Sequence, residues 1–371
     1  MKQNDVIYQI FPRNHYLGHN FKDIAHDLDR IKELGTTIIY LMPIHIIGHK
    51  NKKGTYGSPY AIKDYYSIDP FLGVLEDFKT LVNKTHDLGM KLILDMVFNH
   101  TSPDNVLLDD HEDYYFHKNG KLSNRVGEWS DIVDLDTFKD ETQDYLISVL
   151  KYWISLGVDG FRFDVASMIP LSFFKKAREI LGKDIIFIGE SIDNGFANYL
   201  RSIGEYTTPD KDMYPTFDSL YNYNYYREFI KYLLHQGSLN EFIDLINLDE
   251  TNQRLICLEN HDNDRISSIL DKDKLIKWLE FFSFIKGQVF IYEGQEYGNT
   301  HKPELFEYDP VNLSNKDLDI YKIYKDYINI KKSQKEIVYQ HIDVIDTNKV
   351  IVTIKYIDNS LIKREFILPT K

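Results

Sequence analysis

The chain repeats one pattern: an amphipathic helix, a glycine, and a short apolar strand that ends in polar residues. In the first copy, apolar residues recur at spacings of three and four from Phe21 to Leu34, which predicts a helix with one buried face. Gly35 supplies a helix stop, and the apolar run TTIIYLMP predicts a buried strand. The same order returns before KLILDMVFNH, VDGFRFDVA, DIIFIGES and QVFIYEGQE. These copies predict strands that alternate with helices.

Alternating strands and helices predict a parallel sheet covered by helices, because each parallel connection needs a crossover. The runs VIYQIF, RLICLE and MYPTFDS add three strands to the series. The expected strands begin near Val6, Thr37, Leu92, Asp159, Ile185, Met213, Leu255 and Gln288. Eight strands close a (β/α)8 TIM barrel. A doubly wound open sheet is the alternative, but no glycine-rich phosphate loop follows the first strand.

Two segments fall outside the repeat. Residues 101–136 are rich in Asp, His, Tyr and Asn and are longer than an ordinary connection of about 2–6 residues, so we expect an inserted excursion after the third strand. After a helix near 318–332, residues 336–371 alternate in polarity, which predicts a small C-terminal β region packed on the barrel. The predicted α/β chain therefore has a barrel made of residues 1–100 and 137–335.

Composition and charge exclude several classes of protein. The 44 basic and 57 acidic side chains give a net charge of −13, which repels phosphate backbones and anionic membranes. We therefore expect neither nucleic acid nor membrane as a partner, and no apolar run approaches the about 20 residues of a membrane span. Cys257 is the one cysteine, and MKQNDVIYQIFPRNHY at the start lacks a signal-peptide-like apolar run. These features predict a cytoplasmic protein whose oligomeric state stays open.

Polar residues gather where the expected strands end, which in such a barrel is the face that carries the active site. Arg162 and Asp164 are two apart on one strand, so both point to the same face, and the guanidinium is expected to keep the carboxylate ionised. Glu190 follows the apolar run IIFIG, where limited hydration favours a protonated carboxyl. One ionised and one protonated carboxyl on neighbouring strands are the nucleophile and acid of glycoside hydrolysis.

Each of these residues also has a purely structural interpretation. An Arg-x-Asp pair on a strand is commonly a structural ion pair, and Asp95 or Glu190 at a strand end can cap the following helix. His100 and His261 can be ordinary buried histidines. The structural interpretation must hold separately at every position, whereas one carbohydrate site accounts for all of them.

Four ordered motifs resemble the sequence regions of the α-amylase family, glycoside hydrolase family 13. They are DMVFNH, GFRFD, GE and ENHD, which begin at Asp95, Gly160, Gly189 and Glu259. The resemblance runs from about residue 5 to 335. It implies Asp164 as nucleophile, Glu190 as general acid and base, and Asp262 as the third carboxylate, with Arg162 orienting Asp164 and Asp95 supporting Arg162. It also implies retention of configuration, which requires the Asp164 and Glu190 carboxyl groups to be about 5–5.5 Å apart.

The same resemblance implies the substrate-binding residues. Tyr60 would stack on the sugar ring beside the cleaved bond, and His100 and His261 would hydrogen-bond its hydroxyls. Trp129 and a tyrosine cluster are further candidates for lining the cleft; the cluster is Tyr221, Tyr223, Tyr225 and Tyr226.

Calcium is a possible ligand, although no cofactor is expected to be required. Asn99 matches a position that often serves as a calcium ligand in amylases. Acidic side chains of the excursion offer oxygens that calcium prefers, namely Asp104, Asp109 and Asp110. However, the chain contains no Asp-x-Asp-x-Asp-Gly loop of the kind that holds calcium.

Two departures from the family pattern bear on substrate length. Ser167 and Met168 follow the expected nucleophile where starch-cleaving members often carry a Lys-His pair, which leaves the product-side subsite undetermined. Gly57 stands three residues before Tyr60, where exo-acting α-glucosidases of the family usually have an aspartate. This departure favours an open, endo-acting cleft.

The expected function is that of a retaining α-glucan hydrolase, α-amylase-like, which cleaves α-1,4 bonds in maltodextrin or starch-type oligosaccharides by double displacement. Alternatives within the family are an exo-acting α-glucosidase and a glycosyl transferase. A magnesium enzyme that abstracts a proton next to a carbonyl is a third, but Arg162 beside Asp164 competes with a metal. A non-catalytic carbohydrate-binding relative is a fourth, which the presence of all three carboxylates disfavours.

Overall fold

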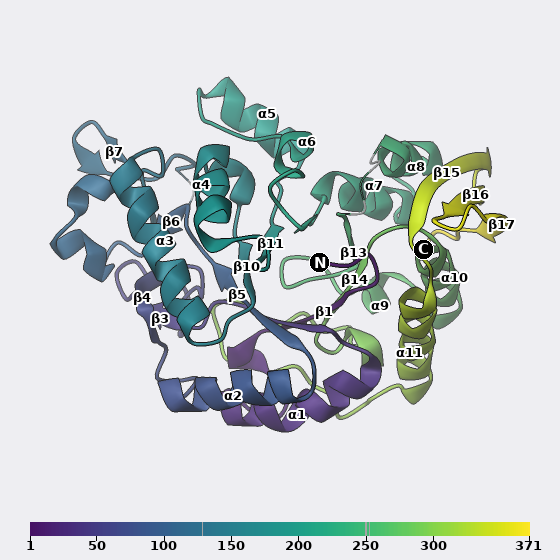
Figure 1. Ribbon diagram of the computed structural model, residues 1–371, viewed down its shortest axis with the longest axis horizontal. Coiled ribbons are helices and arrows are strands. Elements are labelled where there is room, and N and C mark those ends of the chain that lie inside the picture. Colours follow the sequence, from purple (N-terminus) through teal and green to yellow (C-terminus); the bar gives the residue numbers. More distant parts are fainter. Residues whose placement is uncertain (128, 249–250, 252) are drawn as a thin grey trace.

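Parallel strands form the centre of the computed structural model, which describes residues 1–127, 129–248, 251 and 253–371. In the described chain the barrel strands are β1 (Val6–Ile10), β2 (Ile38–Leu41), β5 (Lys91–Met96), β10 (Gly160–Phe163), β11 (Ile186–Gly189), β12 (Ser219–Leu220), β13 (Leu255–Cys257) and β14 (Gln288–Tyr292). Their order in the sheet is β12-β11-β10-β5-β2-β1-β14-β13. A parallel bridge between Leu220 and Arg254 joins the two ends of the sheet. The predicted (β/α)8 barrel is therefore confirmed (Figure 1).

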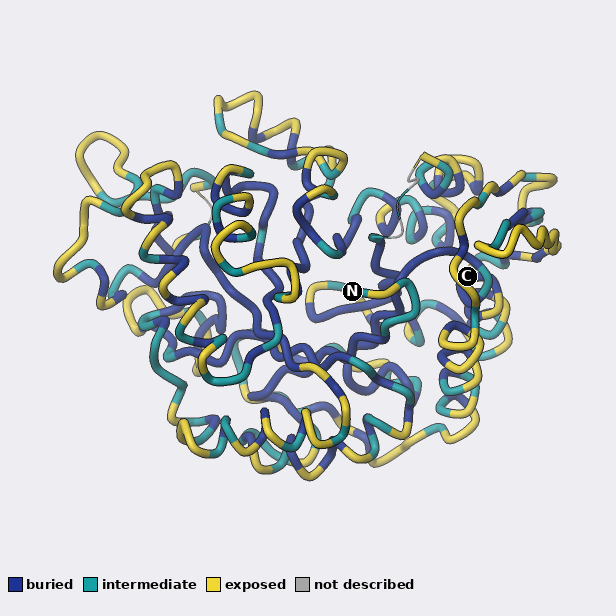
Figure 2. Tube along the Cα trace, viewed as in Figure 1, coloured by how far each residue is buried: buried dark blue, intermediate teal, exposed yellow. Residues whose placement is uncertain are grey.

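Most helices of the described chain lie around the outside of this barrel and bury apolar residues on one face. The described helices are α1 (Phe21–Leu34), α2 (Leu75–Asp87), α3 (Asp140–Ser155), α4 (Leu171–Leu181), α5 (Asn194–Ser202), α6 (Asp210–Met213), α7 (Tyr223–Leu233), α8 (Leu239–Leu248), α9 (Ile266–Ile269), α10 (Lys272–Phe284) and α11 (Leu318–Ser333). The Asn20 side chain caps α1 by accepting from the Asp23 N–H, and Gly35 at φ 112° ends it. Figure 2 shows the strands buried and the outer helix faces exposed. Among these helices, none combines the length and apolar character that crossing a bilayer requires.

The sixth strand lies later in the chain than predicted. Met213 ends helix α6, so the strand expected at MYPTFDS is wrong, and β12 begins at Ser219 instead. β12 contains two residues, which pair with Ile188 and Gly189 of β11. A strand of two residues is too short to show a periodic pattern of apolar residues. Its position depends on its pairing with β11 and on the bridge from Leu220 to Arg254 that closes the barrel.

The excursion after the third barrel strand forms a small lobe at one end of the molecule (Figure 1). Its strands pair as two antiparallel ladders, β6 (His100–Thr101) with β9 (Val133–Asp134) and β7 (His117–Lys118) with β8 (Lys121–Leu122). The sequence analysis missed a hairpin beside this lobe, β3 (His45–Ile47) with β4 (Ile62–Ile68). It interrupts the second helix–strand unit, where β4 shows little apolar alternation.

An antiparallel C-terminal sheet packs on the barrel at the opposite end (Figure 1). Its strands are β15 (Ile337–Asp346), β16 (Lys349–Tyr356) and β17 (Leu361–Ile367). The Asn247 side chain exchanges two hydrogen bonds with the Ile342 backbone, at 2.9 and 3.0 Å. Trp278 Nε1 donates to the Pro369 carbonyl at 2.9 Å. These contacts attach the sheet to α8 and α10.

His45 in the β3–β4 hairpin is a buried imidazole. Its ring lies edge-on to Trp153, with centroids 5.3 Å apart. In the described part of the chain neither ring nitrogen has a hydrogen-bond partner. Burial lowers the pKa of His45 to about 3. In the unfolded chain a histidine has a pKa near 6.5, so below that pH the unfolded chain binds a proton that the folded chain does not. The free energy of unfolding therefore falls as the pH drops from about 6.5 toward 3.

We expect His45→Phe to remove this part of the acid sensitivity. Between pH 7 and pH 4 the variant should lose about 3 kcal/mol less of its free energy of unfolding than the wild type. Urea denaturation at the two pH values measures the difference. An equal loss in both proteins would contradict the assignment.

Candidate active site

A single guanidinium holds three of the predicted carboxyl groups together. Arg162 in β10 is buried, and its Nη1 donates to both oxygens of Asp95, at 2.8 and 3.0 Å, and to Asp164 Oδ1 at 2.9 Å. Its Nη2 lies 2.9 Å from Glu190 Oε2. The strand register explains this arrangement, because Arg162 is paired with Asp95 of β5 and with Ile188 of β11. The side chains that follow those positions therefore reach the same edge of the barrel.

Burial sets the charge balance of this cluster. It raises the pKa of Asp164, the negative charge of Glu190 raises it further, and Arg162 opposes both. Burial also raises the pKa of Asp95 against the effect of Arg162. Arg162 thus favours the ionised form of Asp164, as expected, while burial and the charge of Glu190 oppose it. Asp95 and Asp164 share one cation, so they titrate together and not one by one.

The backbone is strained where the nucleophile and acid candidates meet. Val165 has φ 37° and ψ 44°, the left-handed region that a β-branched residue adopts only at a cost of about 1–3 kcal/mol. This conformation lets the Val165 N–H donate to Glu190 Oε2 at 2.7 Å. The strain therefore fixes the position of Glu190 next to Asp164.

A chain of buried hydrogen bonds forms one wall of the site. The Tyr60 hydroxyl donates to Asp95 Oδ2 at 3.0 Å and lies 2.7 Å from His261 Nε2. Gln9 Nε2 lies 2.9 Å from His261 Nδ1. Burial lowers the pKa of His261 to about 3, so the neutral ring accepts at Nδ1 and donates at Nε2. Nε2 also lies 3.2 Å from Asp262 Oδ2, which places this donor beside the third carboxylate.

His100 lies on another wall, at the start of the excursion. Burial lowers its pKa to about 4, so the ring is neutral at physiological pH. Asn99 Nδ2 lies 3.2 Å from His100 Nδ1. When Nδ1 accepts from Asn99, Nε2 carries the proton that a sugar hydroxyl can accept. Trp129 lies beside the imidazole, with ring centroids 5.7 Å apart.

Tyr223 connects Glu190 with Asp262. Its hydroxyl lies 3.2 Å from Glu190 Oε1 and 3.5 Å from Asp262 Oδ2, within reach to donate to either, and it accepts from Asn260 Nδ2 at 2.8 Å. Nearly half of the Asp262 side chain, 46%, is exposed. The cleft walls still limit its hydration and raise its pKa, which Arg162 and the Tyr223 hydroxyl oppose. The sequence analysis named Tyr223 only as a member of a tyrosine cluster.

We expect Tyr223→Phe to lower kcat/KM by about 10–100-fold, because a hydrogen bond to a charged group is worth about 1.5–3 kcal/mol. Loss of the hydroxyl should also raise the pKa of Asp262 and move the acidic limb of the pH–rate profile to higher pH. Tyr226→Phe, from the same cluster, is the matched control. An unmoved profile would mean that Tyr223 serves only to stabilise the fold.

A pocket of about 270 Å³ collects these side chains. Seven residues named from the sequence line it: Tyr60, His100, Trp129, Asp164, Glu190, His261 and Asp262. Asp95 and Arg162 lie beneath them. The sequence analysis missed other lining residues, which are Lys53, Ser58, Asp131, Ile132, Val165, Leu305 and Phe306. Most of these lie on loops, where no periodic pattern marks a residue that reaches the site.

The residues named as possible calcium ligands do not converge. The Asn99 amide nitrogen faces His100, and Asp104 accepts from the His49 N–H at 3.1 Å and lies 3.5 Å from Lys63 Nζ. Asp109 and Asp110 are exposed. Within the described ranges, no group of three or more His, Cys, Asp or Glu side chains could hold a metal ion. These residues therefore do not fit a calcium site.

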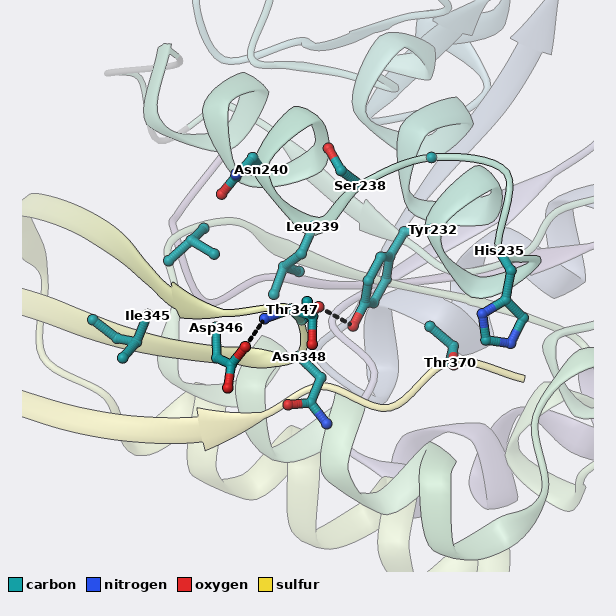
Figure 3. A pocket seen from close by; sticks show the side chains of 12 residues that line it. Tyr232, His235, Ser238, Leu239, Asn240, Ile345, Asp346, Thr347, Asn348 and Thr370 are labelled. Atoms are coloured by element: carbon teal, nitrogen blue, oxygen red, sulfur yellow. Dashed lines mark hydrogen bonds between the residues drawn. The ribbon is translucent and has the colours of Figure 1, made fainter.

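A second cavity, of about 580 Å³, shares no lining residue with the active-site pocket and lies between the α7–α8 turn and the β15–β16 turn (Figure 3). The Tyr232 hydroxyl points to the Thr347 carbonyl, at 3.1 Å, and Asp346 Oδ1 accepts from the Thr347 N–H at 2.7 Å. Hydroxyl, amide and imidazole groups make up most of its polar lining. The cavity belongs to the joint between barrel and C-terminal sheet.

The chain is similar to known proteins in both sequence and structure. Residues 9–342 match the family model of the α-amylase catalytic domain. The structure is similar to that of an α-amylase from Lactobacillus plantarum, with 37% identity, a TM-score of 0.90, and coverage of 95% of this chain and 86% of that one. It is also similar to a maltogenic α-amylase from Thermotoga neapolitana, with 31% identity, a TM-score of 0.86, and coverage of 99% and 86%.

Curated sequences show the same similarity over a smaller share of their length. Alpha-amylase 2 of Dictyoglomus thermophilum is 28% identical over 346 residues, which cover 85% of this chain and 58% of that protein. The intracellular maltogenic amylase of Bacillus subtilis is 30% identical over 312 residues, which cover 77% and 50%. The chain thus spans between half and three-fifths of the length of these two relatives.

Proposed function

Since this chain belongs to the α-amylase family, we propose that it is a retaining α-glucan hydrolase that cleaves α-1,4 bonds in maltodextrin-type oligosaccharides by double displacement. The observation that carries the proposal is the buried Arg162, whose two terminal nitrogens lie 2.9 Å from Asp164 and 2.9 Å from Glu190. The two carboxyl groups that the mechanism needs therefore share one charge partner at one strand edge.

In the first step, Asp164 attacks the anomeric carbon and forms a glycosyl ester, while Glu190 gives its proton to the departing glycosidic oxygen. In the second step, Glu190 takes a proton from a water molecule, which attacks the same carbon and releases Asp164. The Val165 N–H and the Tyr223 hydroxyl hold the two oxygens of Glu190 through both steps.

The remaining side chains bind the sugar that is attacked. Asp262 accepts from its hydroxyls and stabilises positive charge that develops at the anomeric carbon. His100 and His261 are neutral donors at physiological pH, which suits uncharged hydroxyls. Tyr60 is stacked on His261 at an interplanar angle of 16°, and its ring supplies an apolar face for the sugar.

The stereochemistry of the first product tests the mechanism. Maltoheptaose is incubated with the enzyme, and the anomeric protons are followed by NMR before mutarotation. The α-anomer should appear first, and Glu190→Gln should abolish its appearance on the same timescale. Initial release of the β-anomer, or no cleavage of maltodextrins, would overturn the proposal. Products longer than the substrate would identify glycosyl transfer.

We propose a cytoplasmic location for this activity. One relative is named an intracellular maltogenic amylase. The one cysteine, Cys257, is buried and unpaired, as is usual for proteins of reducing compartments.

We also propose that activity requires no bound cofactor, because Asn99 and Asp104 face different partners and Asp109 and Asp110 are exposed. Dialysis against EDTA should leave kcat within about two-fold and the melting temperature unchanged. A specific calcium ion at 100 times its dissociation constant contributes about 2.7 kcal/mol, which corresponds to about 3–4 °C for a chain of 371 residues. A fall of that size, reversed by calcium chloride, would contradict this proposal.

A further inference from the structure

One end of the active-site pocket is closed by loops that are bonded to one another. The Tyr56 N–H donates to the Phe306 carbonyl at 3.0 Å, which joins the loop before β4 to the loop after β14. The buried Arg13, after β1, donates from Nη1 to the carbonyls of Gly57, at 2.9 Å, and Leu305, at 3.2 Å. Three barrel loops therefore form a continuous wall.

The excursion completes this wall. Lys53 Nζ lies 2.7 Å from Asp131 Oδ1, and Asn51 Nδ2 donates to the Ser130 carbonyl at 3.2 Å. Lys53 also lies over the Phe306 ring, 5.9 Å from its centroid. Lys53, Asp131 and Phe306 all line the pocket. The ion pair thus spans the rim between the excursion and the barrel loops.

The other side of the carboxylates is open. A groove of about 690 Å³ begins at Asp262 and Tyr223 and continues along α7 past Arg227 and Lys231. The pocket beside the loop wall has about 270 Å³, below the about 300–1,000 Å³ of pockets for drug-sized ligands, and so holds about one or two sugar rings. The groove has room for a longer chain.

The position of Glu190 indicates which part of the substrate lies in the pocket and which part lies in the groove. The acid protonates the oxygen of the leaving group, so the leaving chain lies on the side of Glu190. Glu190 lines the pocket together with Asp164, and its Oε1 faces Tyr223, which borders the groove. The sugar attacked by Asp164 then lies against Tyr60 and His261, in the pocket beside the loop wall. The non-reducing part of the substrate therefore meets the loop wall.

We propose that the enzyme acts at the non-reducing end of an α-glucan and releases units of one or two sugars, with Lys53 and Asp131 recognising hydroxyls of the terminal ring. This inference rests on the proposed hydrolase function and deepens it. Lys53 and Asp131 are specificity-determining residues that lie outside the catalytic carboxylates. Gly57 stands where exo-acting members usually have an aspartate, which favoured an endo-acting cleft. In this chain Lys53 and Asp131 in the loop wall take the place of that aspartate at the chain end.

A substrate with a blocked chain end tests the inference. Rates are compared for maltoheptaose and for maltoheptaose whose non-reducing terminal ring carries a 4,6-O-ethylidene group. The wild type should cleave the blocked substrate at least about 100-fold more slowly, and glucose or maltose should be the first product of the free one. Equal rates on both substrates would overturn the inference and leave the hydrolase function intact. Cleavage of neither substrate would refute the hydrolase function itself.

Lys53→Ala then tests the wall. Lys53 lies on a partly exposed loop, so the variant should fold normally, and the ratio of blocked to free cleavage should rise at least about ten-fold. Lys84→Ala is the matched control, because it breaks a surface pair of similar length, Lys84 Nζ to Asp29 at 2.8 Å. A ratio in Lys53→Ala equal to that of the control would exclude Lys53 as the specificity residue.

Discussion

Replacement of Asp164 by asparagine should lower kcat/KM on maltoheptaose by at least about 10⁴-fold, because the double displacement loses the carboxylate that forms the glycosyl ester. The melting temperature should not fall. Asp164 competes with Asp95 and Glu190 for one guanidinium, and burial raises its pKa, so a neutral amide of the same shape relieves the cluster. The expected outcome is a stable, inactive protein, as is common where a site trades stability for activity.

Chemical rescue separates a nucleophile from a structural carboxylate. In Asp164→Gly, azide should fill the vacated space and displace an activated aryl leaving group, giving a β-glycosyl azide. The azide forms the new bond to the anomeric carbon as the aryl oxygen departs with the bonding pair. Absence of the azide product, together with activity within ten-fold of the wild type in Asp164→Asn, would refute the assignment of Asp164.

Replacement of Arg162 by methionine should lower the free energy of unfolding by about 3–5 kcal/mol at pH 7 and abolish turnover. The substitution leaves buried carboxyl groups of Asp95, Asp164 and Glu190 without their shared cation, and removal of one partner from a buried pair costs about that much. Urea denaturation and an activity assay on maltoheptaose measure the two effects.

The stability of Arg162→Met relative to the wild type should change with pH if the loss comes from charge, and should not change if it comes from packing. Without the cation, the already raised pKa values of Asp95 and Asp164 should rise further. A carboxyl with a raised folded-state pKa contributes stability that is present at low pH and is lost as the pH rises through that pKa. The stability deficit of the variant should therefore shrink from pH 8 to pH 5. The double variant with Asp95→Asn should recover part of the loss at pH 7, and a deficit independent of pH would indicate lost packing instead.

The sequence was most informative where one structural rule repeats. Helix, glycine and buried strand recur, and the strand ends of a parallel barrel meet at one face, so the sequence alone predicts that Asp95, Arg162, Asp164 and Glu190 lie together. Seven of the eight expected strands begin within one residue of their predicted positions, and β12 is the exception. With two residues, β12 is determined by its pairing across the barrel seam and not by its own apolar pattern.

The sequence by itself thus determined the barrel, the order of its strands and the set of carboxylates, because these follow from local periodicity and from motif order. Only the tertiary structure decided how the charges balance, since three carboxyl groups that share Arg162 affect one another through distances that no spacing reveals. The tertiary structure also determines the strained backbone of Val165, the contact of Tyr223 with Glu190 and Asp262, and the wall formed by Lys53, Asp131 and Phe306. These residues come from loops far apart in the chain, and only the folded barrel brings them to one pocket.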